Sequence, residues 1–345
     1  MNHVDYGGAA LAYIELIEHL YQDYDVECIV YTGTYNSINE RCNKLGIENF
    51  SAPYRNFISS YRCPAFLWRL FLRIRHFIGN SLALKKIEND VDMSNIDLIY
   101  TNLDRIDIGA ILSVKYRIPH VWHIREHLDT DFKILSIKKN YVKYMKKFNS
   151  SFVSISESVK KAWLKRGFTF DEIKVIYDGV NIGSITKKEI CQEGDLRILF
   201  IGGYCAEKGQ IDFLKTVAKL DEKIKNRIKI DMYGSGLAKL MKELNNIVEE
   251  LKLEDRVSFN EYNKDIYSVI NEYDVGINYS VEEGFGRVTI EYMAAGVVPI
   301  VTSNGASKEI VQNEISGFVV DRNNEEQLGK AISELFNREK YNWMS

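Results

Sequence analysis

Short apolar runs alternate with longer amphipathic stretches along almost the whole chain. The apolar runs are rich in Val, Ile and Tyr, whereas the longer stretches repeat their apolar positions with helical period. The runs expected to form strands are 26–31, 97–101, 120–124, 152–155, 174–176, 197–201, 229–233, 257–259, 275–278, 298–301 and 317–320. The clearest helices are expected at 11–20, 210–220, 237–251 and 327–336. This alternation predicts an α/β fold with parallel sheets that helices cover on both faces.

The chain is long enough for two domains of ordinary size. Its 345 residues exceed the length of an average single domain, and the least patterned stretch lies at 178–195. We therefore expect an N-terminal domain over residues 1–180 and a C-terminal domain over residues 181–345.

Composition narrows the class of protein. Apolar residues make up 46% of the chain and charged residues 27%, with a net charge of -3, which does not favour a nucleic-acid partner. The five cysteines form no CxxC pair and no metal-ligand spacing, so they are expected to be reduced thiols of a cytoplasmic protein. No apolar run approaches the roughly 18 residues that a membrane span needs.

The stretch 280–291 carries the most chemical information. It reads SVEEGFGRVTIE, follows an expected strand and enters an expected helix, with Glu283 in the loop and Glu291 about two turns into the helix. Two glycines flank Phe285, so the backbone can approach a ligand closely, and the helix N-terminus suits a diphosphate. Carboxylates at these places suit sugar or ribose hydroxyls. From spacing alone, a solvated surface loop is an equally good interpretation.

Several motifs in one order resemble the family 4 glycosyltransferases of the GT-B fold. The spacing of Glu283 and Glu291, with Gly284-Phe285-Gly286 between them, resembles that family's signature. Further similar segments lie at 154–159, 175–180, 198–202, 207–210, 233–236, 271–280, 293–299 and 305–311. The resemblance covers about residues 7–335.

The resemblance implies two Rossmann-like domains that face each other across a cleft. It also implies transfer of a sugar from a nucleotide-diphosphate donor with retention at the anomeric carbon, without a metal or another cofactor. The implied site comprises Glu283 and His123 beside the donor sugar, Glu291 on the ribose, Lys208 at the diphosphate, backbone donors at Gly284, Phe285 and Gly286, and Gly8 in an N-terminal loop. A structural role for His123 is a competing interpretation.

The sequence departs from the family pattern in two respects. Gly203 stands where the family usually has an arginine that grips the diphosphate, so Arg287 is expected to supply part of that grip. Only six residues precede Gly7-Gly8, and the chain stops soon after the 327–336 helix. We therefore expect the N-terminal domain to lack its first strand. A truncated, non-catalytic nucleotide- or glycan-binding remnant is one alternative function, and a sugar-nucleotide epimerase of the same architecture is a less favoured one.

The basic stretch 64–80 allows two interpretations. At helical spacing Leu67, Leu70, Phe71, Ile74, Phe77 and Ile78 share one side, and Arg69, Arg73 and His76 share another. The helix can lie on an anionic membrane near a lipid-linked acceptor. Alternatively it packs its apolar side on the domain and leaves the basic side in water. We expect a surface-glycan or lipid-linked acceptor, and a cytoplasmic enzyme with possible peripheral contact with the inner face of the membrane.

Overall fold

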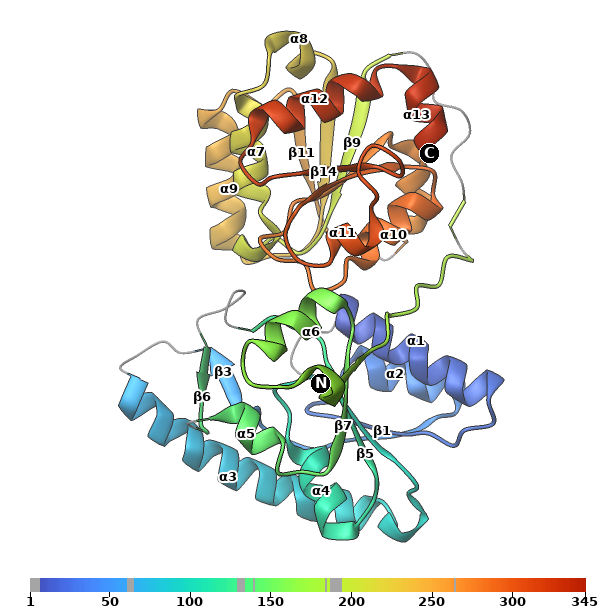
Figure 1. The fold of residues 1–345 in the computed structure, drawn as a ribbon, viewed down its shortest axis with the longest axis vertical. Coiled ribbons are helices and arrows are strands. Elements are labelled where there is room, and N and C mark those ends of the chain that lie inside the picture. Colours follow the sequence, from blue (N-terminus) through green and yellow to red (C-terminus); the bar gives the residue numbers. More distant parts are fainter. Residues whose placement is uncertain are drawn as a thin grey trace. The chain divides into compact units, whose positions relative to one another are not determined.

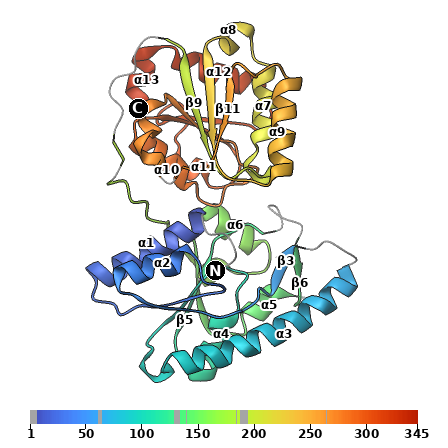
Figure 2. The ribbon, with the colours of Figure 1, turned by 180° about the vertical axis from the view of Figure 1, so that it is seen from behind.

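The computed structural model describes residues 7–60, 65–128, 134–138, 140–183, 185–186, 194–263 and 265–345. The chain divides into two compact units, Met1–Gly179 and Val180–Ser345, whose elements Figures 1 and 2 label. Each unit is an α/β structure with parallel strands, which confirms the predicted fold class. The expectation about a first strand concerns residues 1–6, which lie outside the described residues.

The C-terminal unit contains one six-stranded parallel sheet. Its strands are β9 (Leu196–Ile201), β10 (Ile228–Tyr233), β11 (Val257–Asn260), β12 (Val275–Asn278), β13 (Val298–Thr302) and β14 (Phe318–Val320). They lie in the order β11-β10-β9-β12-β13-β14, with all neighbours parallel. The chain thus winds outward in one direction from β9 and then, from β12, in the other. This is the strand order of a Rossmann-like domain.

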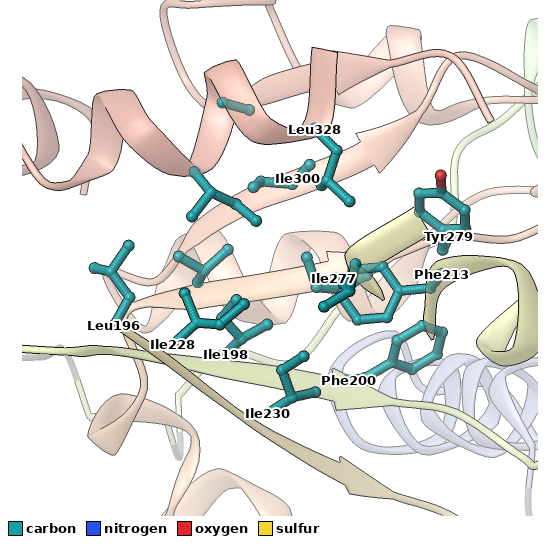
Figure 3. Close-up of a cluster of buried hydrophobic side chains, with 14 of the residues drawn as sticks. Leu196, Ile198, Phe200, Phe213, Ile228, Ile230, Ile277, Tyr279, Ile300 and Leu328 are labelled. Carbon is teal, nitrogen blue, oxygen red and sulfur yellow. The ribbon is translucent and has the colours of Figure 1, made fainter. Parts of the chain in front are cut away.

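Helices cover both faces of this sheet because its strands are apolar on both sides. They are α7 (Gln210–Ala218), α8 (Glu222–Lys225), α9 (Ala238–Glu250), α10 (Arg287–Ala294), α11 (Ser307–Ile310), α12 (Glu325–Leu335) and α13 (Arg338–Met344), with 3₁₀ turns η3 (Ala206–Lys208), η4 (Ile266–Ser268) and η5 (Ile270–Glu272). Alternate residues of β9 face opposite cores. Ile198 and Phe200 join a cluster with α7, α9 and α12 (Figure 3), and Leu199 packs with Tyr292 of α10.

In the described part of the N-terminal unit, the strands form three sheets. The largest is parallel, with the order β4-β5-β7-β8, formed by β4 (Ile99–Asn102), β5 (His120–Ile124), β7 (Ser150–Ser154) and β8 (Ile173–Val175). A parallel pair joins β1 (Ile29–Thr32) and β2 (Glu48–Ser51), and an antiparallel pair joins β3 (Ile58–Ser60) and β6 (Ile134–Ser136). The helices are α1 (Gly8–Asp23), α2 (Ser37–Leu45), α3 (Ala65–Asp90), α4 (Ile108–Tyr116), α5 (Tyr141–Met145) and α6 (Glu157–Leu164), with 3₁₀ turns η1 (Met93–Asn95) and η2 (Phe170–Glu172).

Every expected strand overlaps an observed one, and 120–124 and 275–278 coincide with β5 and β12. Pattern reading missed β2, β3 and β6. Their sequences, ENFS, ISS and ILS, are short and partly polar, so they carry too little periodicity to be recognised. Pairing with a neighbouring strand creates these elements.

Candidate active site

Lys208 and Glu283 meet at the point where the sheet order reverses. Lys208 ends the turn that follows β9, and Glu283 lies in the loop that follows β12, the neighbour of β9. In doubly wound sheets ligands bind outside the carboxyl ends of the strands at this switch point. The topology therefore places both residues at the candidate ligand site.

Glu283 is held by a small polar network. The Lys208 ammonium lies 3.0 Å from its Oε2. The Ser280 hydroxyl lies 2.8 Å from the same carboxylate oxygen and 2.9 Å from the side-chain oxygen of Asn278. The Asn278 amide donates to the Thr289 hydroxyl on α10 at 3.1 Å. Sequence reasoning gave no role to Asn278, the last residue of β12, or to Ser280, two residues further on.

These neighbours keep the buried carboxyl ionised. Burial by itself raises the pKa of a carboxyl group, but the Lys208 charge and hydrogen bonds from Lys208, Ser280 and Asn278 outweigh burial and lower the pKa of Glu283. At neutral pH the site therefore holds an ion pair between the buried Glu283 carboxylate and the partly exposed Lys208 ammonium. Such a pair is costly unless its hydrogen bonds are satisfied, and it gives a polar ligand two strong partners.

Backbone contacts fix the loop that carries Glu283. The Val281 amide donates to the Glu207 carbonyl at 2.8 Å, which ties this loop to the Lys208 turn. On its other side, the Ala306 amide donates to the Glu283 carbonyl at 2.8 Å. Glu283 is thus fixed between the loops that follow β9 and β13.

Helix α10 begins directly after the glycine-rich turn. Gly286 precedes it with φ of 100°, a conformation that favours glycine. Phe285 is buried, and Arg287, also buried, is the first helical residue. Glu291 accepts a hydrogen bond from the Tyr267 hydroxyl at 2.9 Å. It lies one turn into α10 rather than the two turns expected, because the helix starts only at Arg287.

Two expected site residues lie in the N-terminal unit. Gly8 is exposed and is the first residue of α1, so it belongs to a helical turn rather than to the loop we expected. His123 is buried on β5. The structure thus brings Lys208, Glu283, Arg287 and Glu291 together in one unit, and it places Gly8 and His123 in the other.

The hydrogen bonds of His123 indicate its tautomer. Its Nδ1 faces the Tyr100 hydroxyl and lies 3.4 Å from a guanidinium nitrogen of Arg125. Because a guanidinium can only donate, Nδ1 accepts from Arg125, the Tyr100 hydroxyl also donates to it, and the ring proton sits on Nε2. That Nε2 is buried and has no partner among the residues that the structure describes. Burial and then the Arg125 charge lower the pKa of His123 to about 3. His123 is therefore a neutral imidazole whose buried Nε2–H has no partner among the described residues.

A second polar cluster surrounds Arg125, immediately beyond β5. Its guanidinium forms an ion pair with Asp178 and lies 3.3 Å from the side-chain oxygen of Asn102. Asp104 is fully buried, and burial and the Glu126 charge raise the pKa of its carboxyl. Sequence reasoning did not select Arg125, Asp104 or Asp178. Their positions just after strands are the signal that would have found them.

No group of three His, Cys, Asp or Glu side chains in the described part of the chain is arranged to hold a metal ion. Within the same residues, no helix is both long and apolar enough to cross a membrane.

Comparison with solved structures shows the fold. The Anabaena protein HepE, solved with UDP and glucose, aligns with a TM-score of 0.78 at 20% identity, over 99% of this chain and 90% of HepE. WaaG, a glycosyltransferase involved in lipopolysaccharide biosynthesis, aligns with a TM-score of 0.67 at 13% identity, over 98% and 89%. These likenesses confirm the predicted GT-B fold, with two Rossmann-like domains.

Sequence comparison shows the family. A glycosyltransferase of Methanocaldococcus jannaschii is 30% identical over 269 residues, which are 75% of this chain and 70% of that protein. A Campylobacter jejuni N-acetylgalactosaminyltransferase, named for an undecaprenol-linked glycan, is 22% identical over 97% of this chain and 87% of its own length. The model of "Glycosyltransferase Family 4" matches residues 6–184, and that of "Glycosyl transferases group 1" matches residues 182–343. The chain therefore belongs to the group 1 glycosyltransferases of family 4.

Proposed function

We propose that this glycosyltransferase transfers a sugar from a nucleoside-diphosphate donor to a glycan or lipid-linked acceptor, with retention and without a metal ion. The observation that carries the proposal is the ion pair between the partly exposed Lys208 and the buried Glu283 at the switch point of the C-terminal sheet, beside the N-terminus of α10. Anionic groups are favoured at such helix ends, and ligands bind at such switch points.

The charges suit a leaving diphosphate. As the glycosidic bond breaks, the diphosphate gains negative charge, and a preplaced ammonium stabilises the transition state more than the ground state. Lys208 and the first turn of α10, which begins with Arg287, supply positive charge and dipole without a divalent ion. Glu283 is ionised beside Lys208, where its carboxylate can accept hydrogen bonds from hydroxyl groups of the sugar. Glu291, held by Tyr267, faces the ribose in this proposal.

The relatives support the substrate classes. HepE has been solved with UDP-glucose, and the Campylobacter relative is named for an undecaprenol-linked substrate. A lipid-linked acceptor requires the enzyme to work at a membrane surface. Helix α3, which contains most of the stretch 64–80, exposes large apolar side chains, as such contact requires.

The donor site is tested with a binding screen and two variants. Nucleotide sugars are screened for thermal stabilisation of the full chain, and the affinity for the best one is measured by calorimetry. Glu291→Gln should weaken binding by about 1.5–3 kcal/mol, because a charge-assisted hydrogen bond to the ribose is lost. Glu283→Gln should lower kcat more than it weakens binding. Glu243→Gln, on the exposed part of α9, is the matched control. Parental binding and turnover by both site variants would show that the site is elsewhere.

The reaction class is tested on the product. The anomeric proton signal of the product should show the configuration of the donor sugar, and turnover should survive excess chelator. An inverted product contradicts retention. Loss of turnover with chelator that magnesium or manganese restores contradicts metal independence. A chain that binds donor but transfers to no glycan or lipid-linked acceptor would support the non-catalytic alternative.

A further inference from the structure

Helix α3 packs with its apolar side outward. Its large apolar side chains recur at helical spacing, and each is at least 50% exposed: Leu67, Leu70, Phe71, Ile74, Phe77, Ile78 and Leu82. We call this set the α3 stripe. The side of the helix that is buried in the N-terminal unit includes two polar residues, His76 and Asn80. The structure thus contradicts the interpretation in which the apolar side packs on the domain and His76 faces water.

A buried carboxylate enforces this orientation. Asp107, which is fully buried, accepts hydrogen bonds from the His76 ring and the Asn80 amide, both at 3.0 Å, and from the Tyr144 hydroxyl at 2.8 Å. Rotating α3 to bury the stripe would remove two of these donors from a buried anion. Leaving such a group unsatisfied is unfavourable, so the stripe stays exposed.

A basic pocket opens beside the stripe. It has a volume of about 570 Å³ and lies between α3 and residues 137–147. Its wall contains four cationic side chains and two aromatic ones: Arg73, Lys138, Lys143, Lys147, Phe77 and Tyr144. None of the lining residues that the structure describes is acidic. Phe77 belongs both to the pocket wall and to the α3 stripe.

The cations are positioned but not neutralised. Within the described residues, Arg73, Lys138, Lys143 and Lys147 form no ion pair. The Arg73 Nε donates to the Ile137 carbonyl at 3.1 Å, and the Lys138 ammonium lies 4.3 Å from the centre of the Tyr144 ring. Tyr144 is in turn fixed by Asp107. Like charges held together repel one another, and a bound anion removes that repulsion.

We propose that this pocket binds the phosphate of an anionic phospholipid headgroup while the α3 stripe lies in the membrane interface. A phospholipid is the ligand that joins the two features, because it offers a negative phosphate directly beside hydrocarbon. Arg and Lys are the usual phosphate partners, and an exposed apolar helix face with neighbouring cations is typical of interfacial binding. This proposal rests on the membrane contact in the proposed function. It adds which residues make that contact and which chemical group of the lipid they bind.

The test measures co-sedimentation of the full chain with vesicles of phosphatidylcholine alone or mixed with phosphatidylglycerol. Each cation near an anionic surface contributes about 1 kcal/mol, or about fivefold in partitioning. Lys143→Glu with Lys147→Glu should therefore weaken binding to the anionic vesicles at least about tenfold and leave the weak binding to neutral vesicles unchanged. The matched control, Lys239→Glu with Lys242→Glu on the exposed face of α9, should change binding less than about twofold.

A second pair of variants isolates the stripe. Ile74→Ser with Phe77→Ser should weaken binding to both kinds of vesicle, whereas Leu98→Ser, at an exposed apolar position outside α3, should not. Donor affinity and the melting temperature should be parental in every variant. The donor affinity separates a loss of lipid binding in the pocket from a loss of donor binding, and the melting temperature detects misfolding.

Two outcomes would overturn the proposal. Equal binding of anionic vesicles by the pocket variant and the α9 control would show that the pocket does not hold the headgroup. Binding of inorganic pyrophosphate that depends on Lys143 and Lys147, without binding to either vesicle, would identify a site for a free anion instead of a lipid.

Discussion

At the scale of single residues, two buried titratable groups are kept in opposite states by their neighbours. Glu283 stays charged because Lys208 and the end of β12 provide an ammonium and hydrogen bonds. His123 stays neutral because burial and Arg125 disfavour a second positive charge. Burial disfavours the charged form of both groups. At His123 the Arg125 charge acts in the same direction as burial, whereas at Glu283 the Lys208 charge and the hydrogen bonds outweigh it.

The state of His123 predicts a pH dependence of stability. Its pKa falls from 6.5 in the unfolded chain to about 3 in the folded one. Between these values the unfolded chain binds more protons at this position, so the free energy of unfolding should fall as the pH is lowered from about 6.5. Hydrogen exchange of β5 amides at pH 7 and pH 5 measures this loss. His123→Asn should reduce the difference between the two pH values, and His19→Asn, on the exposed part of α1, should not. An unchanged difference in the His123 variant would show that this ring does not titrate as proposed.

Gly203 gives a second prediction at this scale. Its position follows β9 at the switch point, and a Cβ there would meet only the Ser235 carbonyl oxygen, at an ordinary 3.6 Å. An arginine therefore fits there, and in the proposed donor site its guanidinium would lie near the diphosphate. Gly203→Arg should tighten binding of the nucleoside diphosphate by about 1 kcal/mol, as a partly exposed charge-assisted contact does. Calorimetry with the nucleoside diphosphate measures this gain, and Gly203→Gln is the uncharged control. Equal affinities for the two variants would mean that the diphosphate lies elsewhere.

At the scale of elements, the donor loops depend on close backbone approach. Glu283 pairs with Gly305 across the loops that follow β12 and β13. A Cβ on Gly305 would lie 2.2 Å from the Glu283 carbonyl oxygen, and its φ is 71°. Only glycine satisfies both conditions, so this residue sets the position of the loop that carries Glu283.

Gly305→Ala should therefore unfold the C-terminal unit more easily and weaken donor binding. Gly46 is a matched control, because its φ is 73° but a Cβ there would have no neighbour within 4 Å. Gly46→Ala should cost only the left-handed backbone strain of about 1–2 kcal/mol. Urea unfolding and donor calorimetry compare the two variants. Similar losses of stability, with parental donor binding for both, would show that the close approach is unimportant.

Helix α3 shows the limit of pattern reading for an element. Its spacing correctly separates an apolar side from a side with Arg69, Arg73 and His76. The spacing cannot show which side is buried, because that depends on Asp107, which directly precedes α4, and on Tyr144 of α5. The buried hydrogen bonds to Asp107 reverse the usual arrangement.

At the scale of the whole molecule, the chain consists of two units with separate cores. Lys208, Glu283 and Glu291 all lie in the unit Val180–Ser345. A fragment of residues 180–345 should therefore fold and bind the nucleotide sugar with nearly the affinity of the full chain. Circular dichroism and calorimetry test the fragment. An unfolded fragment would contradict independent folding of this unit, and a fragment that folds without binding would place essential donor contacts in residues 1–179.

Sequence alone determined the fold class, most strand positions and the acidic motif. Hydrophobic periodicity reports which residues are buried, and a loop between strand and helix in a parallel sheet has a fixed place at the carboxyl edge. For this reason Glu283 and the glycine turn could be selected from the order of residues along the chain, whereas Lys208 was implied by the family resemblance. The structure adds that Lys208 and Glu283 pair directly across 3.0 Å.

Tertiary structure alone decided the protonation states, the partners and the exposed faces. The tautomer of His123 depends on a hydrogen bond to Tyr100, 23 residues away in sequence. The exposure of the α3 stripe depends on the hydrogen bond between His76 and Asp107, which are 31 residues apart. Such contacts leave no periodic signal, because each depends on packing between elements rather than on spacing within one. Electrostatic environment and burial are properties of the folded neighbourhood, so they appear only when the elements come together.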